Sequence, residues 1–334
     1  MLYLNKPTVK QLADYADSMK QTLLDAVPNS GIPVAAQTFL DEKRVTSILT
    51  DTPDLLIRHH NEFMPKLIKN FNGKEYLTYL KIKSKQDKDL SLVEKTLIGR
   101  YKISGSLLKI FDYEKILSKS KSKSYNLATV LDRYTCTYCN RLYTNTVITP
   151  LEKGQRRLND DNRITRPQFD HWFAHSVYPI LGVSFYNLIP SCSVCNSSVK
   201  GDEIFDLENY THPYMQDPAE VFSFSFNHKD IKDLNVKINV KKGSKMANHL
   251  SAFKISEVYN AHSAMELRDL LDLKYKYTDD YIHTLFNDTF DALDVSLEEI
   301  YRMVFGIEQM EQNYHKRPFS KFKHDILKEL ILIS

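Results

Sequence analysis

Glycine is scarce in this sequence, and the glycine-rich loops that hold phosphates are missing. Only 9 of the 334 residues are glycine. Neither a G-x-x-x-x-G-K-[ST] loop nor a G-x-G-x-x-G fingerprint occurs, and Gly73-Lys74 lacks both the earlier Gly and the following Ser or Thr. Nucleotide-binding loops of these two kinds are therefore excluded. Any ATP-dependent step would need an ATPase supplied by another chain.

Long apolar runs are also missing. No stretch approaches the roughly 20 apolar residues that a membrane span needs. The first residues, M-L-Y-L-N-K-P, lack the cationic head and apolar run of a signal peptide. A hydrophobic content of 42% and a charged content of 26% are ordinary for a soluble globular protein. We therefore expect a cytoplasmic protein that does not contact membranes.

The overall charge balance says little about partners. The chain carries 45 basic and 42 acidic side chains, a net charge of +3. Residues 65–126 differ, because fifteen Lys or Arg stand there against six Asp or Glu, an excess of 15 − 6 = 9. Such a segment either binds phosphate or simply forms solvated helix faces, and the sequence does not decide between them.

The hydrophobic pattern predicts an α+β, mainly helical fold. Capping boxes at Thr8–Gln11 and Ser296–Glu299 mark two helix starts. Two runs that alternate apolar and polar residues, 222–226 and 236–240, predict a small antiparallel strand pair. Apolar residues at helical spacing predict further helices over 45–57, 64–70, 92–117 and 322–331.

Composition divides the chain into three segments. The run S-K-S-K-S-K-S at 118–124 is low in complexity and predicts an exposed linker. Residues 1–124 would form a helical N-terminal region, with partner docking as one role. Residues 125–213 hold all four cysteines and the only Trp, and residues 214–334 would add the strand pair and C-terminal helices.

The four cysteines form two C-x-x-C pairs with 52 residues between them: Cys136 and Cys139, then Cys192 and Cys195. Each pair can place two thiolates on one metal ion, and four thiolates with no open position are typical of structural Zn²⁺. A redox pair or disulfides are the alternatives, which two pairs in a reducing cytoplasm disfavour. We predict a zinc site that clamps the ends of the enclosed segment.

The enclosed segment contains residues suited to phosphodiester hydrolysis. His171 has the pKa range of a general base at neutral pH. Asp170 offers the hard carboxylate oxygen that Mg²⁺ prefers, and Asn196 could add an amide oxygen. Neighbouring residues on a regular strand face opposite ways, so Asp170 and His171 can share a site only on a twisted or ending strand. We expect the loss of a cysteine, but not of Asp170, to unfold this segment.

The order D-H, then Asn in N-L-I-P, then C-x-x-C-N-x-x-x-K-G resembles the HNH, or His-Me finger, endonucleases. The resemblance implies a ββα-metal nuclease core at the zinc-clamped segment. It makes His171 the general base, and it gives Asn187 the task of bracing the hairpin and orienting that base. Asp170 and Asn196 would hold a catalytic Mg²⁺ or Mn²⁺ ion.

Two further residues follow from the same resemblance. Lys200 stands where a Lys that contacts phosphate or supports the structure is usual. His175 stands where Lys or Pro is expected, and it would contact phosphate or simply pack. Trp172 and Phe173, between the two histidines, are expected to pack in the core.

A closer resemblance links the chain to the HNH subunit of the Septu antiphage system and its retron-associated relatives. It is carried by C-T-Y-C-N-R, F-D-H-W-F-A-H-S-V-Y-P-I-L, Y-N-L-I-P-S-C-S-V-C-N-S-S-V-K-G and R-P-F-S-K-F-K-H-D-I. It implies a bacterial defence nuclease that cuts DNA and works with an ABC-type ATPase partner. Cleavage of RNA such as tRNA, or a non-catalytic zinc-clamped assembly module, are the alternatives, since the motif does not separate DNA from RNA.

Overall fold

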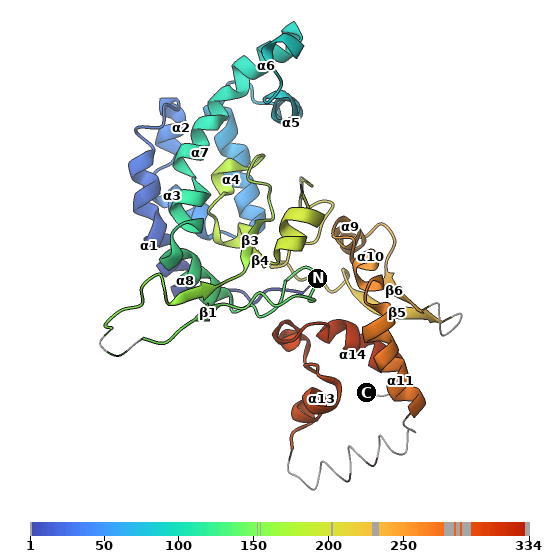
Figure 1. The fold of residues 1–334 in the computed structure, drawn as a ribbon. Helices are drawn as coiled ribbons and strands as arrows, with labels where there is room; N and C mark the ends of the chain where they lie inside the picture. Colours follow the sequence, from blue (N-terminus) through green and yellow to red (C-terminus); the bar gives the residue numbers. More distant parts are fainter. Residues whose placement is uncertain are drawn as a thin grey trace.

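The computed structural model describes residues 2–151, 153, 155–201, 203–228, 234–276, 284, 288 and 295–330. Over these residues the chain is α+β and mainly helical, as the sequence predicts. Figure 1 shows N-terminal helices, then a central part with short strands, then C-terminal helices beside a longer strand pair. None of the described helices has the length and apolar character needed to cross a membrane.

The N-terminal helices pack in pairs. The capping box at Thr8 and Gln11 starts the first of them, as predicted. One expected helix, 45–57, is instead divided, because Pro53 can begin a helix but cannot donate a backbone hydrogen bond to the preceding turn. The four helices are α1 (Val9–Ala26), α2 (Val34–Phe39), α3 (Glu42–Thr50) and α4 (Pro53–Leu67), with α1 against α3 and α2 against α4.

The next stretch is more broken than the sequence predicts. The single helix expected over 92–117 is divided by a 3₁₀ turn and a π turn, and the expected linker at 118–124 is wrong. A helix begins within this run, and Ser124 and Tyr125 are buried in it, while Lys121 is exposed and Lys123 is half-buried. The elements are α5 (Gly73–Ile82), η1 (Asp87–Asp89), α6 (Leu92–Tyr101), η2 (Lys102–Ser106), α7 (Leu107–Ile110), η3 (Glu114–Ser118) and α8 (Lys121–Leu131).

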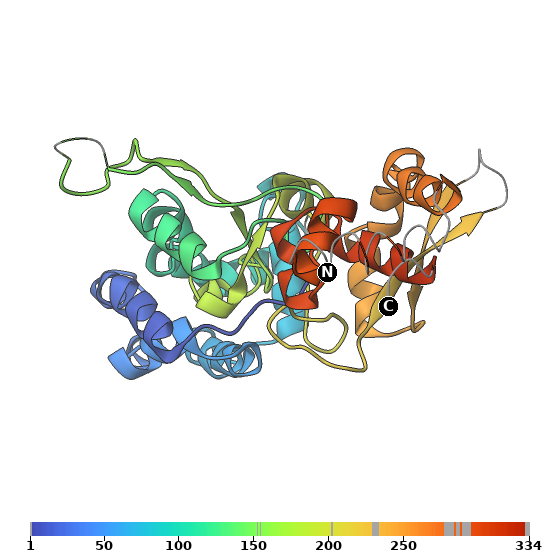
Figure 2. The same ribbon diagram turned by 90° about the horizontal axis from the view of Figure 1, so that it is seen from below.

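The central part contains two short antiparallel pairs. One pair, β1 (Val147–Ile148) with β2 (Arg163–Thr165), forms an arm that projects away from the body (Figure 2). The other, β3 (Gln168–His171) with β4 (Leu188–Ser191), is followed directly by the π-helical turn η6 (Val194–Val199). The loop between β3 and β4 contains η4 (Pro179–Leu181) and η5 (Phe185–Asn187).

The C-terminal part contains the predicted strand pair, β5 (Phe222–His228) with β6 (Leu234–Val240), in which Phe224 is opposite Ile238. The capping box at Ser296 is also confirmed. The last helix ends at Glu329, and Ile331, which we expected to extend it, lies outside the described residues. The remaining elements are α9 (Lys245–Ala252), α10 (Ile255–Asn260), η7 (Ser263–Leu267), α11 (Arg268–Lys276), α13 (Leu297–Phe305), η10 (Glu311–Lys316) and α14 (Ser320–Glu329).

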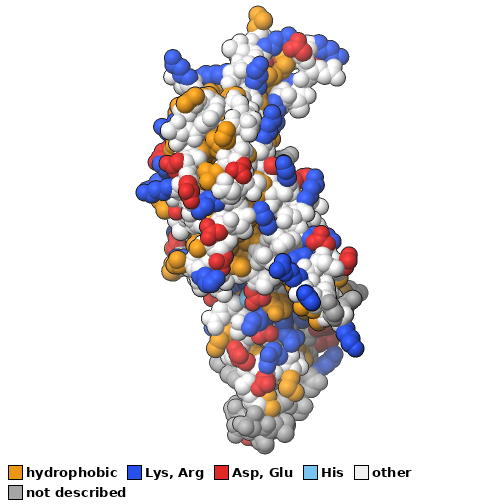
Figure 3. All heavy atoms as spheres, turned by 90° about the vertical axis from the view of Figure 1, so that its left-hand side faces the viewer, with side chains coloured by type: hydrophobic (Ala, Val, Ile, Leu, Met, Phe, Trp, Pro, Cys, Tyr) orange, Lys and Arg blue, Asp and Glu red, His pale blue; other side chains and the backbone are white. Residues whose placement is uncertain are grey.

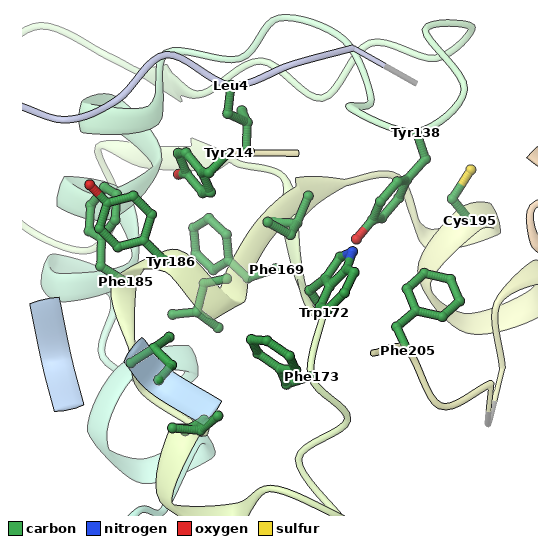
Figure 4. Close-up of a cluster of buried hydrophobic side chains, with 14 of the residues drawn as sticks. Leu4, Tyr138, Phe169, Trp172, Phe173, Phe185, Tyr186, Cys195, Phe205 and Tyr214 are labelled. Atoms are coloured by element: carbon green, nitrogen blue, oxygen red, sulfur yellow. The ribbon is translucent and has the colours of Figure 1, made fainter. Parts of the chain in front are cut away.

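Buried apolar residues from all three parts form one hydrophobic cluster. Trp172 and Phe173 lie inside it and are fully buried, as expected, with Phe205 against the indole (Figure 4). The first residues of the chain run along this centre, and the backbone N–H of Leu2 donates to the carbonyl of Thr137. The division of the chain at 124 and 213 stays a prediction.

Candidate functional site

The four cysteines lie together, all of them buried. Cys136 and Cys139 stand in a turn, while Cys192 follows β4 and Cys195 lies in η6. The four sulfur atoms are all within 4.8 Å of one another, and those of Cys139 and Cys192 are 4.0 Å apart. A tetrahedral zinc ion with bonds of about 2.3 Å needs sulfurs about 3.8 Å apart. The cluster could therefore hold a metal such as zinc after shifts of an ångström or less.

The first cysteine turn is also tied to the C-terminal part of the chain. Asn140 has a left-handed backbone (φ 49°), which turns the chain directly after Cys139. Its carbonyl accepts a 2.7 Å bond from the backbone N–H of Phe319, and the hydroxyl of Tyr259 donates to the carbonyl of Cys139 at 2.6 Å. Loss of the cluster would therefore disturb contacts well beyond the two turns.

Asn187 braces the loop between β3 and β4. Its side chain is fully buried, with Oδ1 accepting from the N–H of Phe173 at 2.6 Å. Its Nδ2 donates to the carbonyls of Phe173 and Leu181, at 3.2 and 2.8 Å. These hydrogen bonds fix the conformation of the loop that follows His171. The predicted role of Asn187 in orienting His171 stays a prediction.

His171 ends β3, and its ring has a defined tautomer. Nε2 lies 2.8 Å from the carbonyl oxygen of Gly182. A carbonyl only accepts, so Nε2 carries the hydrogen and Nδ1 is the basic nitrogen. Burial is the main cause that lowers the pKa of His171 to about 4, and the nearby His175 lowers it further. The ring is therefore neutral at pH 7 and able to accept a proton at Nδ1.

His175 stacks on His171, and a missing side chain at Gly182 makes room for it. The two imidazole centroids are 5.1 Å apart, with 21° between the ring planes. A Cβ at Gly182 would lie 2.6 Å from Cδ2 and 2.8 Å from Nε2 of His175. Gly182 therefore orients His171 by accepting its hydrogen bond, and it leaves space for the His175 ring because it has no Cβ. Tyr113, directly before η3, contacts the His171 ring edge-on, with the two ring centroids 4.5 Å apart.

Gly182→Ala should destabilise the protein by about 1–3 kcal/mol, because the new methyl group must displace the His175 ring. Urea unfolding would measure this. Combining it with His175→Ala should recover most of the loss. Gly99→Ala, within α6 and with nothing near its Cβ position, is the control and should be neutral or stabilising. A double variant as unstable as Gly182→Ala alone would show that the clash lies elsewhere.

Asp170 is buried and held by two donors. The ammonium of Lys200 lies 2.9 and 2.8 Å from its two carboxylate oxygens and donates to the His171 carbonyl at 2.6 Å. The Tyr138 hydroxyl, from the first cysteine pair, donates to Oδ2 at 2.6 Å. Burial, and secondarily the charge of Asp170, raises the pKa of Tyr138 well above its usual value, so it stays a donor. All three hydrogens of the Lys200 ammonium are thereby directed into the protein.

Lys200→Met should destabilise the protein by about 3–5 kcal/mol, because it leaves the Asp170 carboxylate buried beside a single hydroxyl donor. From the sequence we expected the loss of Asp170 to leave the segment folded. Because the pair is buried, that loss should also destabilise the protein, since it would leave the Lys200 ammonium buried without a carboxylate partner. Urea unfolding measures the stability of both single variants. Asp170→Asn combined with Lys200→Met should recover much of the loss, and Lys241→Met at an exposed site should change stability by less than about 0.5 kcal/mol. An unchanged midpoint for Lys200→Met would contradict the role of the pair.

A cavity of about 1200 Å³ joins these side chains to residues far away in the sequence. Its lining includes Asp170, His171, His175, Asn196 and Lys200, so the structure brings together five of the predicted site residues. Asn196 directly follows Cys195, and its Nδ2 donates a hydrogen bond to Oε1 of Gln168 at 3.0 Å. Other lining residues come from the N-terminal region and include Lys81, Lys83, Leu108 and Tyr113.

Several residues of this site were missed from the sequence. Tyr138 stands between the two cysteines of the first pair, a position that offered the one signal available. Gly182, Tyr113 and the α5 lysines belong to no motif, because only the folded chain brings them to His171. Comparison with protein-family models, with curated proteins and with solved structures found no match. The function is therefore inferred from the arrangement of these side chains.

Proposed function

We propose that this chain is an HNH endonuclease that hydrolyses phosphodiester bonds, with DNA as its substrate. The observation that carries the proposal is His171 in the wall of an open cavity, with Nε2 fixed by a carbonyl and Nδ1 left basic. Asn187 holds the loop that supplies this carbonyl, through its bond to Leu181. A neutral, oriented imidazole beside a cavity is what a general base requires.

The local order of elements supports an HNH core. Strand β3 pairs with β4 over Asp170–Ile189 and His171–Leu188, and η6 follows within three residues of β4. This strand–strand–helix order matches the ββα arrangement that the resemblance implies. We assign the cysteine cluster to structural Zn²⁺, because four buried thiolates close the coordination sphere.

In the proposed reaction, His171 removes a proton from a water molecule through Nδ1. The resulting hydroxide attacks the phosphorus, and the bond to the leaving oxygen breaks on the opposite side. The leaving oxygen takes up a proton from solvent water, and the protonated His171 returns its proton to solvent. Tyr113 and His175 limit the rotation of the His171 ring by contacting it on two sides. Folding therefore already supplies part of the orientational entropy that would otherwise be lost when the base is positioned for reaction.

The resemblance also implies a Mg²⁺ or Mn²⁺ ion on Asp170 and Asn196, and the donor types suit such an ion. The geometry does not, because both oxygens of Asp170 already accept hydrogen bonds from Lys200. Cation binding there would require Lys200 to move. We therefore assign Lys200 to holding Asp170, and we keep metal dependence as a prediction to be tested directly.

The resemblance to the Septu HNH subunit also suggests a biological role for the nuclease. We propose that the chain is the effector nuclease of a bacterial antiphage system that works with an ABC-type ATPase partner. The absence of a phosphate-binding loop from the sequence agrees with such a division of labour. A neighbouring gene that encodes an ATPase would support this part of the proposal, and co-purification of the two proteins would test it.

The activity itself is tested by incubating the zinc-loaded protein with labelled duplex DNA, single-stranded DNA and tRNA, each with Mg²⁺, with Mn²⁺ and with no added divalent ion. EDTA is avoided because it would also remove zinc from the cysteine cluster. Cleavage of DNA that needs added Mg²⁺ or Mn²⁺ is the expected result. Preferential cleavage of tRNA would change the substrate to RNA and leave the chemistry intact. No cleavage of any substrate, alone or with the ATPase partner, would favour a zinc-clamped assembly module.

A further inference from the structure

The cavity beside His171 contains four cationic side chains among its described lining residues, and two of them are occupied by the protein. Lys200 is held by Asp170 and by the carbonyl of His171. Arg166 donates to the carbonyls of Pro167 and Ser118, at 2.7 and 3.3 Å, and its guanidinium lies 5.1 Å from the Phe169 ring centroid. The Lys200 ammonium is fully used inside the protein, and Arg166 is directed largely inward.

The other two cations, Lys81 and Lys83, belong to the C-terminal end of α5. Both side chains are exposed, and within the described part of the chain neither ammonium has an ion pair or hydrogen bond. Burial is the main cause that lowers the pKa of His175, and the charge of the nearby Lys83 lowers it further. A helix of the N-terminal region therefore brings free positive charge to the histidine stack.

The acidic residues among the described lining of the cavity are occupied by other donors. Glu203 accepts from the Tyr210 hydroxyl at 2.7 Å, and Glu114 pairs with Lys119 at 2.7 Å. Asp112 accepts from the backbone N–H of Lys115 at 3.0 Å. Together with the Lys200–Asp170 pair, these contacts leave Lys81 and Lys83 as the cations available to an anion from outside.

The surroundings of this wall carry an excess of positive charge. Of the six acidic side chains in 65–126, four already pair with a Lys or Arg: Glu75, Asp87, Glu94 and Glu114. The same range holds fifteen basic side chains, so cations without a partner outnumber the remaining acids. Figure 3 shows basic side chains at the upper end of the molecule and further down, with acidic ones among them. A local excess of positive charge such as that of 65–126 suits a polyanion.

We propose that Lys81 and Lys83 bind the phosphate backbone of the nucleic acid at the mouth of the cavity. The identity of this polyanion rests on the proposed nuclease function. The N-terminal region then serves as the substrate-binding wall of the site. Lysines contact phosphates as point charges and read no bases, so these contacts position a strand at His171 without selecting its sequence.

The test compares nucleic-acid binding by two proteins that both carry His171→Ala, which prevents cleavage during the measurement. One has no other change and the other adds Lys81→Glu and Lys83→Glu. Fluorescence anisotropy with labelled duplex DNA, single-stranded DNA and RNA gives the affinity over about 50–200 mM salt. We expect the double charge reversal to weaken binding at least about tenfold. The slope of log affinity against log salt should become shallower by about 1.8 for duplex DNA and about 1.4 for single strands, for two lost phosphate contacts.

The matched control adds Lys241→Glu and Lys242→Glu, which make the same change in net charge at exposed positions after β6. An affinity and salt slope equal to those of this control would overturn the proposal. The proposed function fails separately. The native protein could cleave no substrate while the Lys81→Glu and Lys83→Glu variant loses binding. That result would support the proposed binding wall and contradict the proposed catalysis. His171 is then restored in both charge variants. If the native protein cleaves, and the Lys81→Glu and Lys83→Glu variant binds and cleaves like the Lys241→Glu and Lys242→Glu variant, the proposed binding wall is wrong.

Discussion

His171→Ala should lower the rate of phosphodiester cleavage by about 10²–10⁴-fold, the contribution of a general base. The change removes the nitrogen that accepts the proton of the attacking water and leaves Asn187 and the loop it braces in place. Zinc content and far-ultraviolet circular dichroism should match those of the native protein. Single-turnover cleavage of labelled DNA measures the effect without interference from product release.

Two comparisons make this result specific to the base. His262→Ala removes an imidazole that pairs with Arg141 and does not line the cavity, so it should leave cleavage unchanged. His171→Gln should be as inactive as His171→Ala, because an amide cannot accept the proton. A His171→Ala protein that cuts as fast as the native one would remove His171 from the mechanism.

The pH dependence of cleavage follows from the lowered pKa of His171. Burial moves this pKa to about 4, so the neutral imidazole persists down to about pH 4, whereas a free histidine would protonate near pH 6.5. Cleavage that depends on His171 should therefore hold from pH 7 to about pH 5 and decline towards pH 4. An acid limb centred near pH 6.5 would point to another group.

Folding must be followed in the same pH series. His60 and His315 also have a pKa of about 4 because burial disfavours their charged form. Their folded-state pKa lies below the unfolded value near 6.5, so the stability they contribute is complete above pH 6.5 and is lost as the pH falls towards 4. Circular dichroism at each pH separates loss of fold from protonation of His171.

Removing the metal from the cysteine cluster should unfold the chain around it. Structural zinc sites bind with about 10–16 kcal/mol, which is as large as the whole stability of a typical domain, about 5–15 kcal/mol. Cys136→Ser should therefore lose the metal, collapse the thermal transition and lose every activity. The effect should spread to the C-terminal helices, since Tyr259 and Phe319 bond to the turn that holds Cys139.

Metal content by mass spectrometry and thermal unfolding by circular dichroism measure this outcome. Val194→Ala, between the two cysteines of the second pair but not a sulfur donor, should keep one equivalent of zinc and fold normally. Titration with a chelator should reproduce the Cys136→Ser result in the native protein. A Cys136→Ser protein that melts at the native temperature would show that the cluster does not stabilise the fold.

Local signals predicted several elements well. The capping boxes at Thr8 and Ser296 and the alternating runs predicted at 222–226 and 236–240 depend on residues within one turn or one strand, so local sequence is enough to predict them. The prediction of an exposed linker at 118–124 was wrong, because the Lys/Ser composition does not record which side chains the tertiary structure buries. Ser124 and Tyr125 pack inward there, and burial of these side chains makes the segment a helix.

The sequence by itself determined the chemistry that this chain offers: four thiols in two pairs, an Asp–His dipeptide, and the asparagines at 187 and 196. Spacing along the chain was enough, because those residues lie on neighbouring turns and strands. Only the tertiary structure decided which groups are free to act. Burial couples Lys200 to Asp170 and to Tyr138 of the cysteine turn, and packing of α5 against the central part brings Lys81 and Lys83 to the histidines. Both arrangements depend on contacts between segments that are distant in sequence, which no local pattern records.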